Sequence, residues 1–206
     1  MSEISVACQN IIETIKEINI AIIGIDGLGG AGKSGISEKI REKLIENQYH
    51  TVLLHIDDFI NTKKVRYNDA YPDWQCYYDI QWRYDYFVAN VINKIKTNGI
   101  TGVEVELYDR DKDTYYIRNY SIEKKTIVIV EGIFLQRKEL SAIFDFVIYI
   151  DIPEDIRLKR VLIRDTYMGN QQQIINKYEN RYFPAEHKYI NDYHPADYAD
   201  YVIKEL

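Results

Sequence analysis

Hydrophobic residues along the chain form two kinds of pattern, short continuous runs and stripes at helical spacing. The continuous runs predict buried strands at residues 20–25, 51–56, 127–130 and 146–150, and shorter strands are predicted at 103–108 and 199–203. The stripes predict helices at about 9–18, 33–47, 80–97, 153–167 and 171–191. Strands that alternate with helices form a mainly parallel sheet with helices on both faces. We therefore predict a three-layer α/β/α fold.

The length and composition fit one globular domain that spans residues 1–206. The 206 residues are 46% hydrophobic and 28% charged, which is ordinary for a folded protein. The net charge of −6 argues against broad attraction to nucleic acids or membranes. We expect a small-molecule partner, and an anionic ligand would need a local positive site.

The two cysteines, Cys8 and Cys76, suggest neither a disulfide framework nor a zinc site. The N-terminus has no basic region followed by an apolar run, and no apolar stretch approaches the ~20 residues that span a bilayer. We therefore expect a cytoplasmic protein with free thiols. The sequence leaves open whether the chain forms homo-oligomers.

Acidic residues and glycines follow three of the predicted strands. Asp26-Gly27 follows the first, Asp57-Asp58 the second, and Glu131-Gly132 the strand at 127–130. In parallel sheets of this kind, ligands bind beyond the carboxyl ends of the strands. The sequence therefore predicts a ligand site that includes these residues.

The segment between the first strand and the next helix matches the motif G-x-x-x-x-G-K-S in full. Glycines and a small alanine let the backbone curl tightly and point its N–H groups at phosphate oxygens, at the positive end of the following helix. Lysine would neutralise the β- and γ-phosphates, and serine would offer its hydroxyl to Mg²⁺. The predicted nucleotide-binding residues are Gly27, Gly29, Gly30, Ala31, Gly32, Lys33 and Ser34.

Two other kinds of nucleotide site compete with this interpretation. Gly27-x-Gly29-x-x-Gly32 also fits a dinucleotide fingerprint, with Asp57 as its ribose-binding acid. That fingerprint gives Lys33-Ser34 no role, and it does not predict a further acid at Glu131. A GTPase would need N-K-x-D after a strand, whereas the Asn-Lys segment at 93–96 lacks the acid and that at 176–179 falls within a predicted helix.

Phosphoryl transfer to an alcohol requires a base, a metal site and positive charge on the transferring group. Asp57 or Asp58 suits the base, and the residues alone do not choose between them. Glu131 ends an apolar strand, where an acid that supports Mg²⁺ would stand together with Ser34.

Positive charge is provided by Arg157, Arg160 and Arg164, which share one face of a predicted helix. A flexible break at 168–170 follows that helix. A helix–loop–helix with arginines can close over a triphosphate, so we predict a small helical lid at about 157–175.

With these residues together, the chain resembles the uridine kinase and phosphoribulokinase-like family of P-loop kinases, from about residue 20 to residue 203. The matching segments are the strand and loop at 22–34, His-Ile-Asp-Asp-Phe at 55–59, Tyr-Asp at 108–109, Val-Glu-Gly-Ile at 130–133, Arg160, Arg164-Asp165, Tyr178, Pro184 and Ala-Asp-Tyr-Val-Ile at 199–203. The resemblance implies that Asp57 is the catalytic base, that Arg160 and Arg164 act in the lid, and that Tyr108 lies in an acceptor-binding hairpin.

The acceptor side, which we expect at about 61–118, departs from the uridine kinase pattern. The hairpin after Tyr108 lacks the histidine that recognises the pyrimidine, and the ribose-binding motif is replaced by the segment 78–83. Asp79 and Arg83 of that segment are weaker candidates for substrate contacts, together with Asp58. The aromatic residues between 67 and 86 either pack under a long connection or form a wall of the acceptor pocket.

We therefore expect an ATP- and Mg²⁺-dependent kinase whose acceptor is a hydroxyl of a small metabolite, a nucleoside or a ribosyl compound. Catalysis would rest on Lys33, Asp57, Arg160 and Arg164. The alternative is a nucleotide-binding sensor or assembly ATPase without kinase activity. The sequence identifies neither the acceptor nor whether the donor is ATP or GTP.

Overall fold

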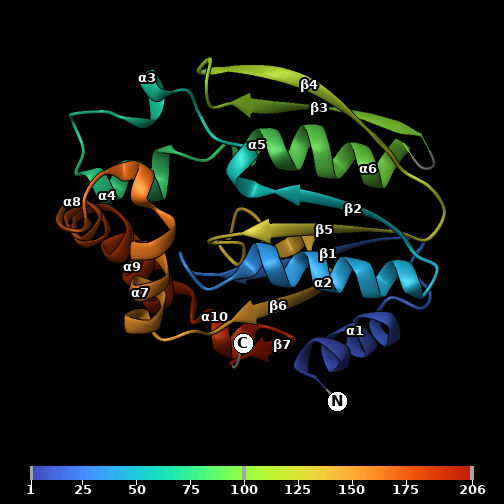
Figure 1. Cartoon of the computed structure of the whole chain (residues 1–206). Coiled ribbons are helices and arrows are strands. Elements are labelled where there is room, and N and C mark those ends of the chain that lie inside the picture. Colours follow the sequence, from blue (N-terminus) through green and yellow to red (C-terminus); the bar gives the residue numbers. More distant parts are fainter. Residues whose placement is uncertain (1, 99–100, 205–206) are drawn as a thin grey trace.

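The computed structural model describes residues 2–98 and 101–204, and Figure 1 shows the arrangement of its elements. Within these residues, a five-stranded parallel sheet has the strand order β2-β5-β1-β6-β7. Its strands are β1 (Ile20–Gly27), β2 (His50–His55), β5 (Thr126–Gly132), β6 (Phe146–Ile150) and β7 (Tyr201–Ile203). The predicted parallel sheet is therefore confirmed.

The larger helices of the described residues are α1 (Glu3–Thr14), α2 (Lys33–Glu46), α7 (Glu154–Arg164), α8 (Gln171–Lys177) and α9 (Phe183–Tyr193). Short helices are α3 (Lys63–Arg66), α4 (Asp73–Gln75), α5 (Tyr84–Tyr86), α6 (Asn93–Asn98) and α10 (Pro195–Tyr198). Wider π-type turns join α5 to α6 and α8 to α9, so that each pair forms one longer helix. No helix among the described residues is long and apolar enough to cross a membrane.

Successive side chains of β1 point to opposite faces of the sheet, and each face is covered by different helices. Ile23 and its neighbours on one face pack against α1 and α2. Ile22 on the opposite face packs against the helix formed by α5 and α6 and against α9. The predicted three-layer α/β/α architecture is confirmed, and Figure 1 shows α2 and the α5–α6 helix on opposite sides of the sheet.

Outside the sheet, β3 (Gly102–Asp109) pairs with β4 (Thr114–Ser121) as an antiparallel hairpin. The sequence predicted β3 but not a strand at β4. Most side chains of β4 are exposed, so this strand lacks the alternation of apolar and polar residues that marks a half-buried strand. The hairpin lies over the α5–α6 helix (Figure 1) and brings the loop at 110–113 to the carboxyl edge of the sheet.

Two predicted helix starts were wrong for local reasons. Helix α1 begins at Glu3 rather than at residue 9, because the Ser2 side chain caps it by accepting a hydrogen bond from the Ser5 N–H. The helix predicted from residue 80 begins at Tyr84. An isolated β-bridge between Ile60 and Trp82 keeps the residues before it out of the helix.

Gly132, the last residue of β5, lies very close to the turn that carries Asp57. A Cβ atom at position 132 would lie 2.0 Å from Cγ2 of Ile56. We expect Gly132→Ala to lower the free energy of unfolding by about 1–3 kcal/mol, because Ile56 is buried and must shift. Urea denaturation measures the effect.

Gly35→Ala is the matched control, because nothing lies within 4 Å of a Cβ atom at that helical position. We expect it to be neutral or to stabilise the protein by up to about 1 kcal/mol. Equal destabilisation by the two substitutions would contradict the close approach of β5 and the turn.

Candidate functional site

A cavity of about 250 Å³ opens at the carboxyl ends of the strands. The strand register explains its position, because β1 and β2 flank β5 and pair with it so that Glu131 lies opposite both Ile25 and His55. The cavity is lined by residues of the phosphate loop and of the acidic strand ends, and by others that come from distant segments. Those from the predicted set are Gly29, Gly30, Lys33, Ser34, Asp57, Glu131 and Arg164.

The loop between β1 and α2 has the tight curl that its glycines predict. Gly30 and Gly32 have φ angles of +79° and +94°, a region that side chains other than glycine rarely adopt. Gly30 also lies against α7, since an added Cβ would be 2.8 Å from the Arg157 carbonyl oxygen. The Lys33 ammonium group donates to the Leu28 carbonyl at 3.1 Å and lines the cavity.

Asp26 anchors the strand that leads into this loop. Its buried carboxylate accepts hydrogen bonds from the Gly27 N–H at 2.8 Å, the Gln136 amide at 3.1 Å and the Tyr189 hydroxyl at 2.5 Å. Burial raises the pKa of Asp26, although these donors oppose the shift. Asp26 therefore ties the start of the loop to the segment after β5 and to α9.

Glu131 and Ser34 lie together beneath the phosphate loop. The Ser34 hydroxyl donates to Oε1 of Glu131 at 3.2 Å, and Nδ1 of His55 lies 2.6 Å from the same oxygen. Burial raises the pKa of Glu131, but the hydrogen bond with His55 and the charge of Lys33 outweigh it, so the pKa is lowered. Glu131 is thus held as a carboxylate.

This pair of oxygen ligands fits magnesium. Among the described residues, no group of three His, Cys, Asp or Glu side chains is arranged as a complete metal cage. Mg²⁺ in phosphoryl-transfer enzymes is usually bound by one or two protein oxygens together with substrate phosphates and water. Ser34 and Glu131 provide such a partial set.

The structure separates the two aspartates that the sequence left as alternatives. Asp57 faces the cavity, whereas Asp58 lines a different hollow with His55 and Arg118. Asp57 is an exposed residue of the cavity, where the protein atoms crowded around its carboxyl group raise its pKa, while the charges of Lys33 and Arg110 oppose the shift. The geometry therefore favours Asp57 over Asp58 as a base for a ligand in this cavity.

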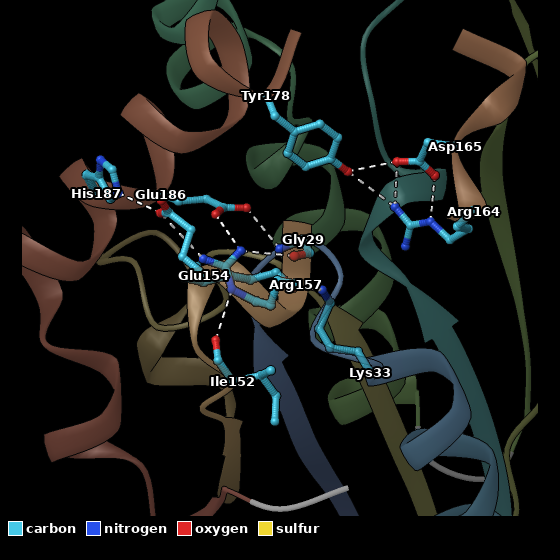
Figure 2. A network of polar contacts seen from close by, with 11 residues as sticks. Gly29, Lys33, Ile152, Glu154, Arg157, Arg164, Asp165, Tyr178, Glu186 and His187 are labelled. Carbon is cyan, nitrogen blue, oxygen red and sulfur yellow. Dashed lines mark hydrogen bonds and ion pairs between the residues drawn. The ribbon is translucent and has the colours of Figure 1, made fainter. Parts of the chain in front are cut away.

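The three arginines of α7 have different surroundings, as Figure 2 shows for Arg157 and Arg164. Arg157 is buried below the phosphate loop, so it supports the loop and is not a mobile lid residue. Arg160 donates to the Ala31 carbonyl at 3.3 Å without lining the cavity. Arg164 lines the cavity and pairs with Asp165 at 2.6 Å, and the Tyr178 hydroxyl donates to the same carboxylate at 2.8 Å.

Glu186 of α9 was missed by the sequence analysis. Its Oε1 accepts from the Gly29 N–H at 2.9 Å, and its Oε2 pairs with Arg157 at 2.7 Å (Figure 2). Burial raises the pKa of Glu186, and Arg157 opposes that shift. A glutamate on the buried face of α9, alongside Phe183 and Tyr189, was the available signal.

Three residues expected at the acceptor side do not reach this cavity. Asp79 lies 3.7 Å from Arg137, and Arg83 pairs with Glu106 and stacks on aromatic rings, in a separate hollow. Tyr108 is buried and donates to Asp113 at 2.5 Å. The structure thus gives these three residues supporting contacts, not a place on the cavity wall.

Other side chains form the wall of the cavity away from the phosphate loop. They are Ile60, Arg66, Tyr67, Tyr77, Gln81, Arg110, Arg181 and Tyr182. The packing interpretation of the aromatic segment is confirmed for Trp82, which lies in the core, whereas Tyr67 and Tyr77 line the cavity and their place in an acceptor pocket stays a prediction.

The buried ion pair between Arg157 and Glu186 should stabilise the fold. Glu186→Ala would leave the Arg157 guanidinium buried without its closest carboxylate, which costs about 3 kcal/mol or more. His187→Ala is the adjacent control, because His187 meets Glu154 only at the surface, where a pair contributes at most about 1 kcal/mol. Urea denaturation of both variants checks this, and equal effects would contradict the role of Glu186.

Comparisons with known proteins identify the family of this chain. The family model for the phosphoribulokinase / uridine kinase family matches residues 22–206. A uridine kinase from Staphylococcus haemolyticus is 32% identical over 190 residues, which cover 91% of this chain and 88% of that protein. A uridine kinase from Staphylococcus carnosus is 31% identical over 189 residues, which cover 89% and 86%.

A solved structure shows the same similarity over almost the whole fold. The "possible uridine kinase" from Bacillus stearothermophilus has a TM-score of 0.81 at 29% identity, covering 98% of this chain and 97% of that one. The residues that the family model matches, 22–206, include the phosphate loop and the acidic strand ends of this chain. The chain therefore belongs to the phosphoribulokinase / uridine kinase family.

Proposed function

We propose that this chain is an ATP-dependent kinase that transfers the γ-phosphate to a hydroxyl group of a small metabolite. One observation carries the proposal: a single cavity is lined by Lys33 and Ser34 of the phosphate loop, by Glu131 and by Asp57. These residues supply a phosphate cradle, a metal-supporting acid and a base. Family membership supports ATP as the donor.

The donor would bind through the loop and through positive charge around it. Backbone N–H groups of the loop and the N-terminus of α2 would hold the phosphates, and Lys33 would neutralise them. Arg164, at the end of α7 and on the cavity wall, would contact the transferring phosphate on closure of the proposed lid.

Ser34 and Glu131 would hold Mg²⁺ together with the donor's phosphates. The bound ion would supply charge neutralisation and orientation of the phosphate chain. The contribution of this chain is to keep Glu131 ionised, through His55 and Lys33, and to hold the Ser34 hydroxyl against it.

Asp57 would accept the proton of the acceptor hydroxyl as its oxygen attacks the γ-phosphorus and the bond to the leaving ADP oxygen breaks. The raised pKa of Asp57 makes the carboxylate a better proton acceptor than an ordinary aspartate. Water would be kept from competing by the aromatic wall, to which Tyr67 and Tyr77 belong.

The relatives described as uridine kinases support a nucleoside or a ribosyl compound as the acceptor. The alternative, a sensor or assembly ATPase on the same scaffold, would bind ATP and hydrolyse it without regard to any alcohol. Acceptor-dependent ADP release separates these two functions.

Substitution of the two neighbouring aspartates tests the assigned chemistry. We expect Asp57→Asn to reduce the rate of acceptor-dependent ADP release by about a hundredfold or more, because a positioned base typically contributes that much. Its affinity for ATP, measured by calorimetry, should change little. Asp58→Asn should keep most of the activity, because Asp58 faces another hollow. Full activity of Asp57→Asn with loss in Asp58→Asn would move the base to Asp58.

A further inference from the structure

The cavity wall away from the phosphate loop is unusually rich in arginine. Arg66 comes from α3, Arg110 from the loop of the β3–β4 hairpin, and Arg181 from the π-type turn before α9. Four acids line the same cavity. Glu131, Asp165 and Glu186 pair with His55, Arg164 and Arg157, and the fourth is Asp57, the proposed base. The chain as a whole is acidic, with a net charge of −6, so this concentration of positive charge is local.

Arg66 is the decisive residue, because it is buried without a carboxylate partner. It is only 8% exposed, and among the residues that the structure describes no acidic oxygen lies within 4.0 Å of its guanidinium nitrogens. Its contacts are a 2.9 Å hydrogen bond to the Asn61 carbonyl and stacking on Tyr108 and Tyr67, at 4.8 and 5.5 Å from the ring centroids. Asp113 lies within electrostatic reach of Arg66, but its hydrogen bonds come from the Tyr108 hydroxyl and the Lys63 N–H, and these lower its pKa more than the charge of Arg66 does. A buried guanidinium group normally has a direct ionic partner, since burying a charge is otherwise costly.

Arg181 lies close to Arg66, and the ring of Tyr67 contacts both guanidinium groups. Arg181 is 1% exposed and is already bound by Asp73 and by Oε1 of Gln81 at 2.9 Å. These bonds fix its orientation at the cavity wall. Asp73 compensates most of the charge of Arg181, but the Arg181 guanidinium group still presents N–H donors beside Arg66.

Arg110 completes the positive wall on the side of the proposed base. Its contact with protein is a 3.5 Å approach to the Asp57 carbonyl, and it forms no ion pair within the described chain. The donor's phosphates already have the loop amides, Lys33 and Arg164. No hydrogen bond or ion pair joins Arg66 or Arg181 to the loop at 27–34, as far as the structure describes the chain.

We propose that the acceptor carries an anionic group, a carboxylate or a phosphate, in addition to its reacting hydroxyl, and that Arg66 is the principal ligand of this group. Arg181 and Arg110 assist it. This inference rests on the proposed kinase function and narrows its substrate class. A guanidinium group binds either anion through paired N–H donors, whereas a neutral nucleoside would leave Arg66 buried without a direct ion pair.

The test uses pairs of acceptors that differ in the anion. Uridine is compared with orotidine, glycerol with glycerate, and ribose with ribose 5-phosphate, at constant ionic strength with ATP and Mg²⁺. For the preferred scaffold, we expect the anionic member to have a kcat/KM at least about tenfold higher in the wild-type protein, the effect of charge-assisted hydrogen bonds. The orotidine and glycerate pairs test a carboxylate, and the ribose 5-phosphate pair tests a phosphate.

Arg66→Gln should remove this preference, and Arg66→Lys, which keeps the charge, should retain part of it. Arg118→Gln is the control for loss of an arginine, because Arg118 is an exposed residue of β4 and does not line this cavity. If Arg66→Gln does not fold, two measurements still test the proposal. The wild-type protein must prefer the anionic acceptors, and Arg66→Lys must weaken that preference.

Equal use of neutral and anionic acceptors, or an unchanged preference in Arg66→Gln, would overturn the proposal while leaving the kinase function intact. If no acceptor promotes ADP release, the kinase function itself fails. Thermal shifts with a non-hydrolysable ATP analogue then decide the anion site separately. The anionic members must stabilise the wild-type protein more than Arg66→Gln, and equal shifts would overturn the site.

Discussion

The phosphate loop depends on a pair of charges that come from two other parts of the chain. Only Leu28 and Ala31 of this loop pack side chains into the core, and the glycines have none, so hydrogen bonds of the backbone help to fix its shape. At Gly29 both backbone groups are held, the N–H by Glu186 and the carbonyl by Arg157 at 2.9 Å each. The buried pair between those side chains is costly to desolvate, and these extra bonds to the loop offset part of that cost.

Because of the same pair, the two ends of α7 have different roles at the site. Arg157 fixes the beginning of the helix below the loop, and Nε of Arg157 also donates to the Ile152 carbonyl at 3.0 Å (Figure 2). Arg164, two turns later, lies on the cavity wall with its side chain 61% exposed. Movement at the end of α7 would thus change the position of Arg164 without disturbing the loop.

The sequence predicted those parts of the site that follow from local rules. The loop motif and the acids at strand ends are local, and parallel pairing with β5 between β1 and β2 brings Glu131 beside the loop and Asp57 to the same cavity. Glu186 and Arg66 could not be assigned, because their roles arise only when helices distant in sequence pack around the loop. The surroundings of Arg83 were equally hidden from the sequence, since its ion pair with Glu106, outside this cavity, arises only in the folded chain.

A kinase differs from an ATPase in that its cavity transfers the phosphoryl group to an alcohol and not to water. Following the label of γ-³²P-ATP in the wild-type protein with each acceptor present separates the two reactions. We expect the label to appear in a phosphorylated acceptor, in proportion to the ADP released. Label found only in inorganic phosphate, at a rate that no acceptor changes, would contradict it.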